Sequence, residues 1–214
     1  MAQIVCLTNF VLLSVLLFTL VQAEHPVVYR RSRARAFIES QCKATLYRDL
    51  CVRSLSYYAK NLTSPFSHKQ LAQIALKVTL AKAESTRAYV TNVAKELKQT
   101  KAKYYQVVEE CLSQISDGVD QLTNCIIETR NIKEDDKSND FPWHASNIQT
   151  WMSTALTDSS TCIDGFSGRA IGGKTKAMIK AKVVNLEQLT SNALALFNRF
   201  AARYRSAHVK KPKV

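Results

Sequence analysis

Apolar residues recur at helical spacing through most of the chain. The clearest series lies between about Lys174 and Arg205, with steps of three or four residues between its members: Ile179, Val183, Leu186, Leu189, Ala193, Leu196 and Phe200. Steps of this size place side chains on one face of an α-helix. The series therefore predicts a long helix whose apolar face packs against other helices.

Three earlier segments carry related patterns. The segment from Ser67, an N-cap residue, to about Gln99 has the expected inner stripe Leu71, Ile74, Val78, Ala81, Ser85 and Ala88. The segment from about Lys101 to Arg130 has the stripe Val108, Cys111, Ile115, Val119, Leu122 and Ile126. The segment from about Phe141 to Ser160 carries Ile148, Trp151 and Ala155. Four such segments joined by three loops predict an antiparallel four-helix bundle.

Upstream of this bundle, residues 36–60 have the spacing of two short helical pieces that flank Cys42 and Cys51, and a break follows at residues 61–65. The whole chain has 5 Gly and 4 Pro in 214 residues, which favours long helices over a sheet. The predicted fold class is all-α.

The first 23 residues read as a signal peptide, since the apolar run from Phe10 to Val21 ends in the small-residue pattern Val21-Gln22-Ala23. The run is too short for a membrane span of roughly 20 residues, although an uncleaved anchor is the alternative. Residues 24–35 hold four arginines without periodicity, so we expect a flexible basic leader, with polyanion binding as its functional alternative. After signal cleavage no membrane association is expected.

The formal net charge of +13 is a statement about partners rather than fold. In a secreted protein the available acidic partners are polysaccharides or acidic proteins, and nucleic acid is excluded as the expected partner. The sequence Asn61-Leu62-Thr63 is a glycosylation sequon, which suits a surface loop.

Five cysteines remain after signal cleavage: Cys42, Cys51, Cys111, Cys125 and Cys162. An odd number in an oxidising compartment indicates two disulfides and one free thiol, and the sequence alone allows 15 such arrangements. No Cys-x-x-Cys occurs and the four histidines lack ligand spacing, so no metal site is expected.

The chain lacks the usual signatures of an enzyme. There is no Gly-x-Ser-x-Gly, phosphate-binding glycine loop or His-Glu-x-x-His, and Ser167 lies in an ordinary glycine turn. Asp117 and Asp120 are one helical turn apart and could form an acid pair, but such a pair is more often an exposed face or an interaction patch. We expect neither catalysis nor a cofactor.

Three motifs give the chain a specific resemblance. They are Phe37-Ile38-Glu39-Ser40-Gln41-Cys42 with Tyr47-x-x-Leu50-Cys51, Cys111-Leu112 with Asp117-Gly118-Val119-Asp120-Gln121-Leu122, and Trp151 to Ala155-Leu156-Thr157 with Thr161-Cys162-Ile163-Asp164-Gly165-Phe166. In this order they resemble the plant invertase and pectin methylesterase inhibitor family, from about Phe37 to Tyr204.

The resemblance implies an N-terminal helical hairpin (36–62) followed by an up-and-down four-helix bundle (63–208) and a basic tail (209–214). It also implies the pairings Cys42–Cys51 and Cys111–Cys162, with Cys125 free. Cys125 would be a buried inert thiol, or alternatively the site of an intermolecular disulfide.

By the same resemblance, the bundle would occupy the substrate cleft of a target enzyme. Asp117, Asp120, Thr161 and Asp164 match family positions that contact the partner, and Ser113 stands where relatives carry an acidic residue. Inhibitors of invertase carry Pro-Lys-Phe, which is absent here; the nearest string is Pro212-Lys213-Val214.

We therefore expect a free-standing, extracellular cell-wall inhibitor of pectin methylesterase. An inhibitor of acid invertase is the first alternative. A basic wall protein held on anionic pectin, without inhibitory activity, is the second.

Overall fold

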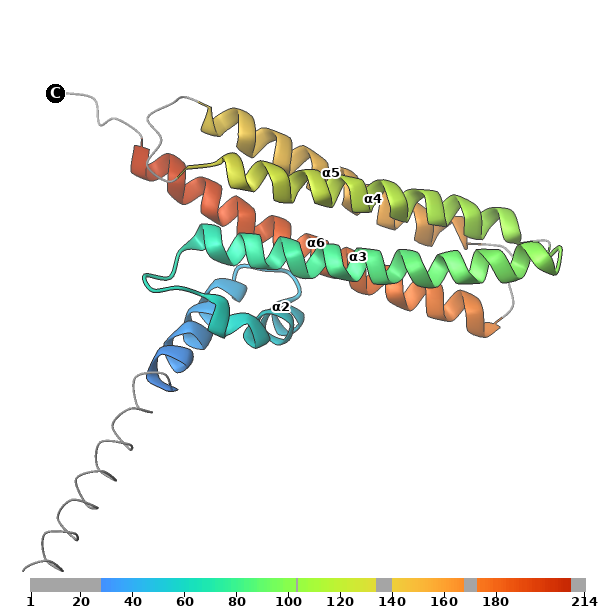
Figure 1. The fold of residues 1–214 in the computed structure, drawn as a ribbon, viewed down its shortest axis with the longest axis horizontal. Helices are drawn as coiled ribbons and strands as arrows, with labels where there is room; N and C mark the ends of the chain where they lie inside the picture. The colour runs from blue at the N-terminus through green and yellow to red at the C-terminus, as the bar shows by residue number, and fades with distance from the viewer. Residues whose placement is uncertain (1–27, 103, 134–139, 168–172, 209–214) are drawn as a thin grey trace, which may run out of the picture.

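A computed structural model of the chain describes residues 28–102, 104–133, 140–167 and 173–208 (Figure 1). Within these ranges the regular structure is helical and includes no strand, which confirms the predicted all-α class. The elements are a helix over residues 28–42, α2 (Arg48–Ser56), the short 3₁₀ helix η1 (Tyr57–Asn61), α3 (His68–Gln99), α4 (Tyr105–Asn131), α5 (Phe141–Gly165) and α6 (Gly173–His208).

Helices α3 to α6 form the expected four-helix bundle. Each packs against its two neighbours in the order α3, α4, α5, α6 and back to α3. As a result, α4 and α5 make one side of the bundle, uppermost in Figure 1, and α3 and α6 make the other. The helix over residues 28–42 and α2 form an N-terminal hairpin, and α2 packs against α3 and α6.

The apolar series of α6 is the buried face that its spacing predicts. All seven of its members are buried, from Ile179 to Phe200. All except Leu189 belong to the two core clusters that together run the length of the bundle. A continuous apolar stripe is removed from water only when that face of the helix packs against other helices, so the spacing of the stripe specifies which face is buried.

The stripe predicted for α3 is confirmed over its first half, where Ile74 and Val78 pack against the core, and is wrong over its second half. Leu71 is buried, but Ala81, Ser85 and Ala88 are exposed. The buried face instead holds Ala72, Ala75, Leu76, Thr79, Ala83, Thr86 and Val90. The threonines can be buried because each hydroxyl donates to the carbonyl four residues earlier, at 2.9 Å for Thr79 and 2.8 Å for Thr86.

The start of α3 follows the sequence prediction. Ser67 has extended backbone angles, and its hydroxyl accepts a hydrogen bond of 3.0 Å from the backbone N–H of Gln70. This is an N-cap, which satisfies one of the donors left open at a helix start. The third bundle helix is longer than expected, because α5 continues past Ser160 to Gly165.

The basic leader is not a flexible arm where it is described. Residues 28–35 belong to the helix that continues to residue 42. Ala34, Ile38 and Cys42 are spaced four residues apart and are all at most 1% exposed. Arginine and alanine are strong helix formers, and this narrow stripe gives the helix a face to bury.

Both predicted disulfides are present and Cys125 is the free cysteine of the described chain. Cys42–Cys51 closes the hairpin, and Cys111–Cys162 joins α4 to α5 across a sequence separation of 51. Cys125 is buried, and its Sγ donates to the carbonyl oxygen of Ile148 at 3.6 Å. The buried position confirms the expectation of an enclosed thiol.

Asn192 of α6 connects the hairpin to the bundle. Its Oδ1 accepts from the backbone N–H of Tyr47 at 3.1 Å, and its Nδ2 donates to the Tyr47 carbonyl at 2.9 Å. Asn192 is 3% exposed, so this pair of bonds is shielded from water. Two bonds to one backbone position fix where the hairpin loop meets α6.

The expected signal segment (1–23), the start of the leader and the tail (209–214) lie outside the described residues. None of the helices described is long and apolar enough to cross a membrane.

Candidate partner-binding surface

Helices α4 and α5 run antiparallel in a constant register. Three contacts fix it, each seven residues from the next on both helices: the Cys111–Cys162 disulfide, the approach of Gly118 to Ala155 and the hydrogen bond from Cys125 to Ile148. Seven residues are close to two helical turns, so the same faces meet along the whole pair. The outer surface of this pair is accordingly held in one arrangement.

The two ends of the pair are secured differently. At one end both sulfurs of the disulfide are buried. At the other end, Glu128 of α4 faces His144 Nδ1 at 2.9 Å and accepts from Asn147 Nδ2 at 3.1 Å, both on α5. Burial opposes ionisation of Glu128, but the hydrogen bonds from His144, Asn147 and Asn131 outweigh it and lower its pKa.

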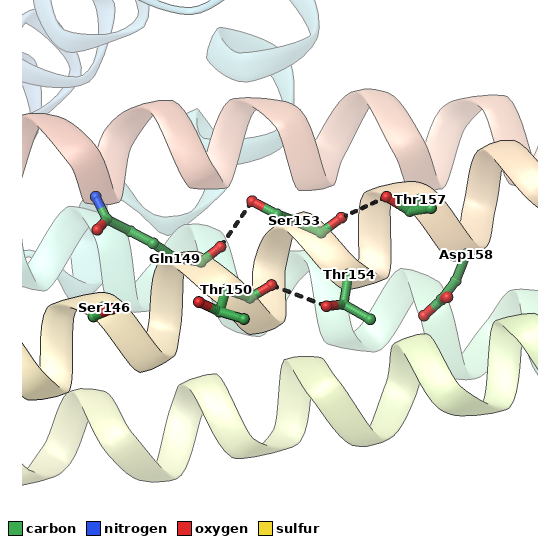
Figure 2. A pocket seen from close by; sticks show the side chains of 7 residues that line it. All are labelled: Ser146, Gln149, Thr150, Ser153, Thr154, Thr157 and Asp158. Carbon is green, nitrogen blue, oxygen red and sulfur yellow. Dashed lines mark hydrogen bonds between the residues drawn. The ribbon is translucent and has the colours of Figure 1, made fainter.

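A polar groove of about 510 Å³ follows the outer face of α5. Figure 2 shows its lining, which comes from α5 alone: Ser146, Gln149, Thr150, Ser153, Thr154, Thr157 and Asp158. Thr154 and Asp158 lie toward α4, whereas Ser153 and Thr157 lie toward α6. The groove therefore lies over the outer face of α5, with α4 on one side of it and α6 on the other.

Three of the five hydroxyl groups that line the groove already donate their hydrogens to the backbone. Ser153 donates to the Gln149 carbonyl at 2.8 Å, and Thr157 donates to the Ser153 carbonyl at 3.1 Å. Thr154 bonds its own preceding turn in the same way. The lone pairs of these oxygens are left facing outward, so the groove presents mainly acceptors.

Asp158 is the least satisfied group in this surface. Its Oδ2 is shielded from solvent and has no hydrogen-bond partner among the described residues. Burial, and then the negative charge of Asp117 on α4, raise the pKa of Asp158 above its ordinary value. Asp158 lines the groove, so positive charge or hydrogen-bond donors brought there by another molecule would favour its ionised form.

The residues predicted to contact a partner all lie exposed on this side of the molecule: Ser113, Asp117 and Asp120 on α4, and Thr161 and Asp164 on α5. Ser113 and Thr161 flank the disulfide in sequence, at two positions after Cys111 and one before Cys162. By the register of the pair, Asp120 and Asp164 are about 16 Å apart along the bundle axis. The five residues therefore form an extended patch and do not converge on one point.

We call this combined surface the acidic face: the outer sides of α4 and α5, including the α5 groove. Its two helices carry seven acidic residues and one basic residue, Arg130. Helix α5 has no lysine or arginine at all. Such a surface offers carboxylates and hydroxyl lone pairs to a partner that supplies donors or positive charge.

Sequence reasoning missed Asp158 and the α5 groove. A signal for the groove was present, because Ser146, Thr150, Thr154 and Thr157 repeat at steps of four, four and three. No sequence signal placed Asp158 beside Asp117, since that depends on the register of α4 against α5. No group of His, Cys, Asp or Glu side chains in the described residues could hold a metal ion.

Comparison with known proteins identifies the family of the chain. The family described as plant invertase/pectin methylesterase inhibitor matches residues 36–196. The chain belongs to that family. A crystal structure of a mutant form of a pectin methylesterase inhibitor from Arabidopsis shares the fold, with a TM-score of 0.56 and 16% identity over 73% of this chain and 92% of that one.

Two proteins from Arabidopsis thaliana are similar to this chain at much higher identity. Pectinesterase inhibitor 9 is 41% identical over 92% of this chain and 96% of that protein. Pectinesterase inhibitor 11 is 40% identical over 95% of this chain and 100% of that protein. Similarity of this kind extends across nearly the full length of the chains and includes both halves of the acidic face.

Proposed function

We propose that this chain inhibits pectin methylesterase, and that it does so by docking its acidic face reversibly and without covalent chemistry over the enzyme's substrate cleft. The observation that carries the proposal is the rigid, cation-poor surface of α4 and α5, held in register by the buried Cys111–Cys162 disulfide. The relatives of highest identity quoted above are named pectinesterase inhibitors, which supports the same target.

The geometry suits inhibition by occupation. Carboxylates on a rigid helix need little ordering when they accept hydrogen bonds from a partner, so little of the interaction free energy is lost. Asp117 lies near enough to Asp158 for its charge to raise the pKa of Asp158, and the hydroxyl groups of the α5 groove continue the acceptor surface from Asp158. A cleft lined with basic or hydroxyl donors is the complement of this surface. This role requires neither a catalytic group nor a cofactor.

A direct test is inhibition of purified pectin methylesterase, measured as methanol release, by the secreted protein and by the double variant Asp117→Asn with Asp120→Asn. We expect the variant to inhibit at least tenfold more weakly. The matched control is Glu84→Gln with Glu96→Gln, which removes the same charge from exposed positions of α3 on the opposite side. Equal inhibition by both variants would contradict docking through the acidic face.

Ser113 offers a second test of the same surface, because it stands on the α4 stripe with Asp117 and Asp120. The variant Ser113→Asp adds a carboxylate without disturbing the core, since Ser113 is exposed. We expect a measurable change in the inhibition constant while the unfolding midpoint stays within a degree or two. No change in inhibition would place the partner away from this part of α4.

Acid invertase is the alternative target. The absence of Pro-Lys-Phe argues against it, and the names of the quoted relatives refer to pectinesterase. Parallel assays of both enzymes with one preparation decide between them. Inhibition of invertase alone would reverse the assignment.

We further propose that the protein is secreted to the plant cell wall, where its charge of +13 brings it into contact with anionic pectin. Asn61, exposed at the end of η1, would carry a glycan there. N-terminal sequencing of the secreted protein tests cleavage after Ala23. Loss of a glycosidase-sensitive mass shift in Asn61→Gln tests the glycan.

A further inference from the structure

The charges of the bundle are divided between its two sides. Helices α4 and α5 carry a formal charge of −6, from seven acidic residues and one basic residue. Helices α3 and α6 carry thirteen basic and three acidic residues, a formal charge of +10. The bundle therefore has two oppositely charged sides, which the positive net charge of the protein does not reveal. We call the α3–α6 side the basic face.

One corner of the basic face gathers positive groups where α3 begins. Thr79 Oγ1 of α3 lies 3.3 Å from the Leu189 carbonyl of α6, and the two helices are antiparallel. Eleven residues back along α3 is His68, which is thereby level with residue 200 of α6. Arg199 and Arg203, one turn apart on α6, stand on either side of that level.

Three further observations describe this corner. The ring of His68 meets Phe37 edge-on at 5.5 Å, which holds it against the N-terminal hairpin. Burial, and then the charges of Arg203 and Arg199, lower the pKa of His68, as expected for an imidazole enclosed beside cations. The first turn of α3 contains no acidic residue, so the positive end of its dipole is not balanced there.

The corner lacks the acceptors that such groups normally have. Neither Arg199 nor Arg203 forms an ion pair with any carboxylate of the described chain. Arg199 Nε and His68 Nε2 are shielded from solvent and have no hydrogen-bond partner there either. Like charges held together without a counter-ion cost stability, and a bound carboxylate would relieve that cost.

We propose that the basic face binds a linear polyuronate, with its primary carboxylate site at Arg199 and Arg203, beside the enclosed His68 ring. The arginine side chains supply planar donor pairs that match carboxylates. The hairpin meets α6 at Asn192, so the polymer would bind at the end of α6 that carries Arg199 and Arg203, beyond that contact. Lys182 lies over the Tyr89 ring at 4.7 Å and continues the positive surface across α6 and α3 farther along.

The inference deepens the proposed function and rests on it for the choice of polymer. An esterase that demethylates pectin creates free carboxylates, so its product is a polyuronate. Because the basic face and the acidic face lie on opposite sides of the bundle, the protein can hold this product while it inhibits the enzyme. The inhibitor would accumulate where demethylation has already occurred.

The test measures binding of the purified protein to polygalacturonate and to highly methyl-esterified pectin, without any enzyme present. We expect Arg199→Gln with Arg203→Gln to weaken polygalacturonate binding at least tenfold. Lys174→Gln with Lys180→Gln removes the same charge from the far end of α6, and should weaken it less than threefold. Equal losses in the two variants would overturn the assigned site.

Further measurements test the identity of the ligand and distinguish polyuronate binding from the proposed inhibition of the esterase. Equal binding of polygalacturonate and of esterified pectin, or of polygalacturonate and polyglutamate, would overturn the choice of a polyuronate. The single variant Arg203→Gln repeats the test at an exposed position, in case the double variant unfolds. Asp117→Asn with Asp120→Asn should keep full polyuronate binding. If esterase inhibition is never observed but this binding is, the proposed function fails and the basic-face site stands.

Discussion

Removal of the Cys111–Cys162 disulfide is the perturbation whose magnitude follows most directly from the structure. The bridge closes a loop with a sequence separation of 51, whereas Cys42–Cys51 closes one of 9. The chain-entropy relation gives about 4 kcal/mol for the longer loop and about 2.6 kcal/mol for the shorter one. Most of this effect arises in the unfolded chain, which regains freedom when the crosslink is absent.

The variants to compare are Cys111→Ala with Cys162→Ala, and Cys42→Ala with Cys51→Ala. Alanine is preferable to serine because all four positions are buried, and a serine hydroxyl would lose its hydrogen bonds to water. Urea unfolding followed by circular dichroism gives the free energy of unfolding of each variant. We expect the α4–α5 variant to lose the larger amount, by about 1.5 kcal/mol over the hairpin variant.

The same pair of variants separates stability from function. Cys111–Cys162 fixes the acidic face, whereas Cys42–Cys51 lies in the hairpin on the other side of the bundle. Under conditions where both variants are fully folded, inhibition of the esterase should weaken more in the α4–α5 variant. If the hairpin variant is the less stable of the two, the loop-entropy reasoning is refuted.

Three other changes test the packing and electrostatics of α4 and α5. Gly118→Ala should raise the free energy of unfolding by about 0.5 to 1 kcal/mol, as measured by thermal or urea unfolding. Alanine favours the helix, and its Cβ would meet Ala155 at an ordinary contact distance of 3.9 Å. A decrease in the free energy of unfolding would mean that α4 and α5 cannot accept a methyl group between them. Asp158→Asn should stabilise the protein at neutral pH, because the raised pKa means that ionised Asp158 opposes folding beside Asp117. In strong acid the variant and the unchanged protein should be equally stable, as measured by their unfolding midpoints across pH. A difference in midpoint that does not depend on pH would refute this cause. Burial raises the pKa of Cys125 to about 12. A thiol reagent at pH 8 should therefore leave the folded, secreted protein unmodified, and should label one thiol per chain after denaturation. Rapid labelling of the folded protein would contradict the buried site.

The sequence by itself determined the elements that depend on large apolar side chains and on local chemistry. The α6 stripe, the Ser67 cap and the existence of four long helices follow from residue spacing, because a helix brings residues three and four apart together whatever surrounds it. The disulfide pairing followed only from resemblance to relatives, since five cysteines by themselves allow several pairings.

Tertiary structure decided what spacing leaves open. In α3, alanines and threonines occur on several faces, and contact with α4 and α6 selects which of them is buried. The start of the helix over residues 28–42, at residues 28–35, was missed because its buried stripe is narrow and surrounded by arginines. Short, small side chains carry too little transfer free energy to specify a face without neighbours.

The functional surfaces also depend on the tertiary structure. Asp158 becomes a distinctive group only because α4 brings Asp117 to it, and the His68 corner exists only because α6 returns antiparallel to α3. Residues so far apart in the chain have no local relation that a sequence pattern could express. Composition gives a single net charge of +13, whereas packing places a formal charge of −6 on the α4–α5 side of the bundle and +10 on the α3–α6 side, because each pair of neighbouring helices makes one side.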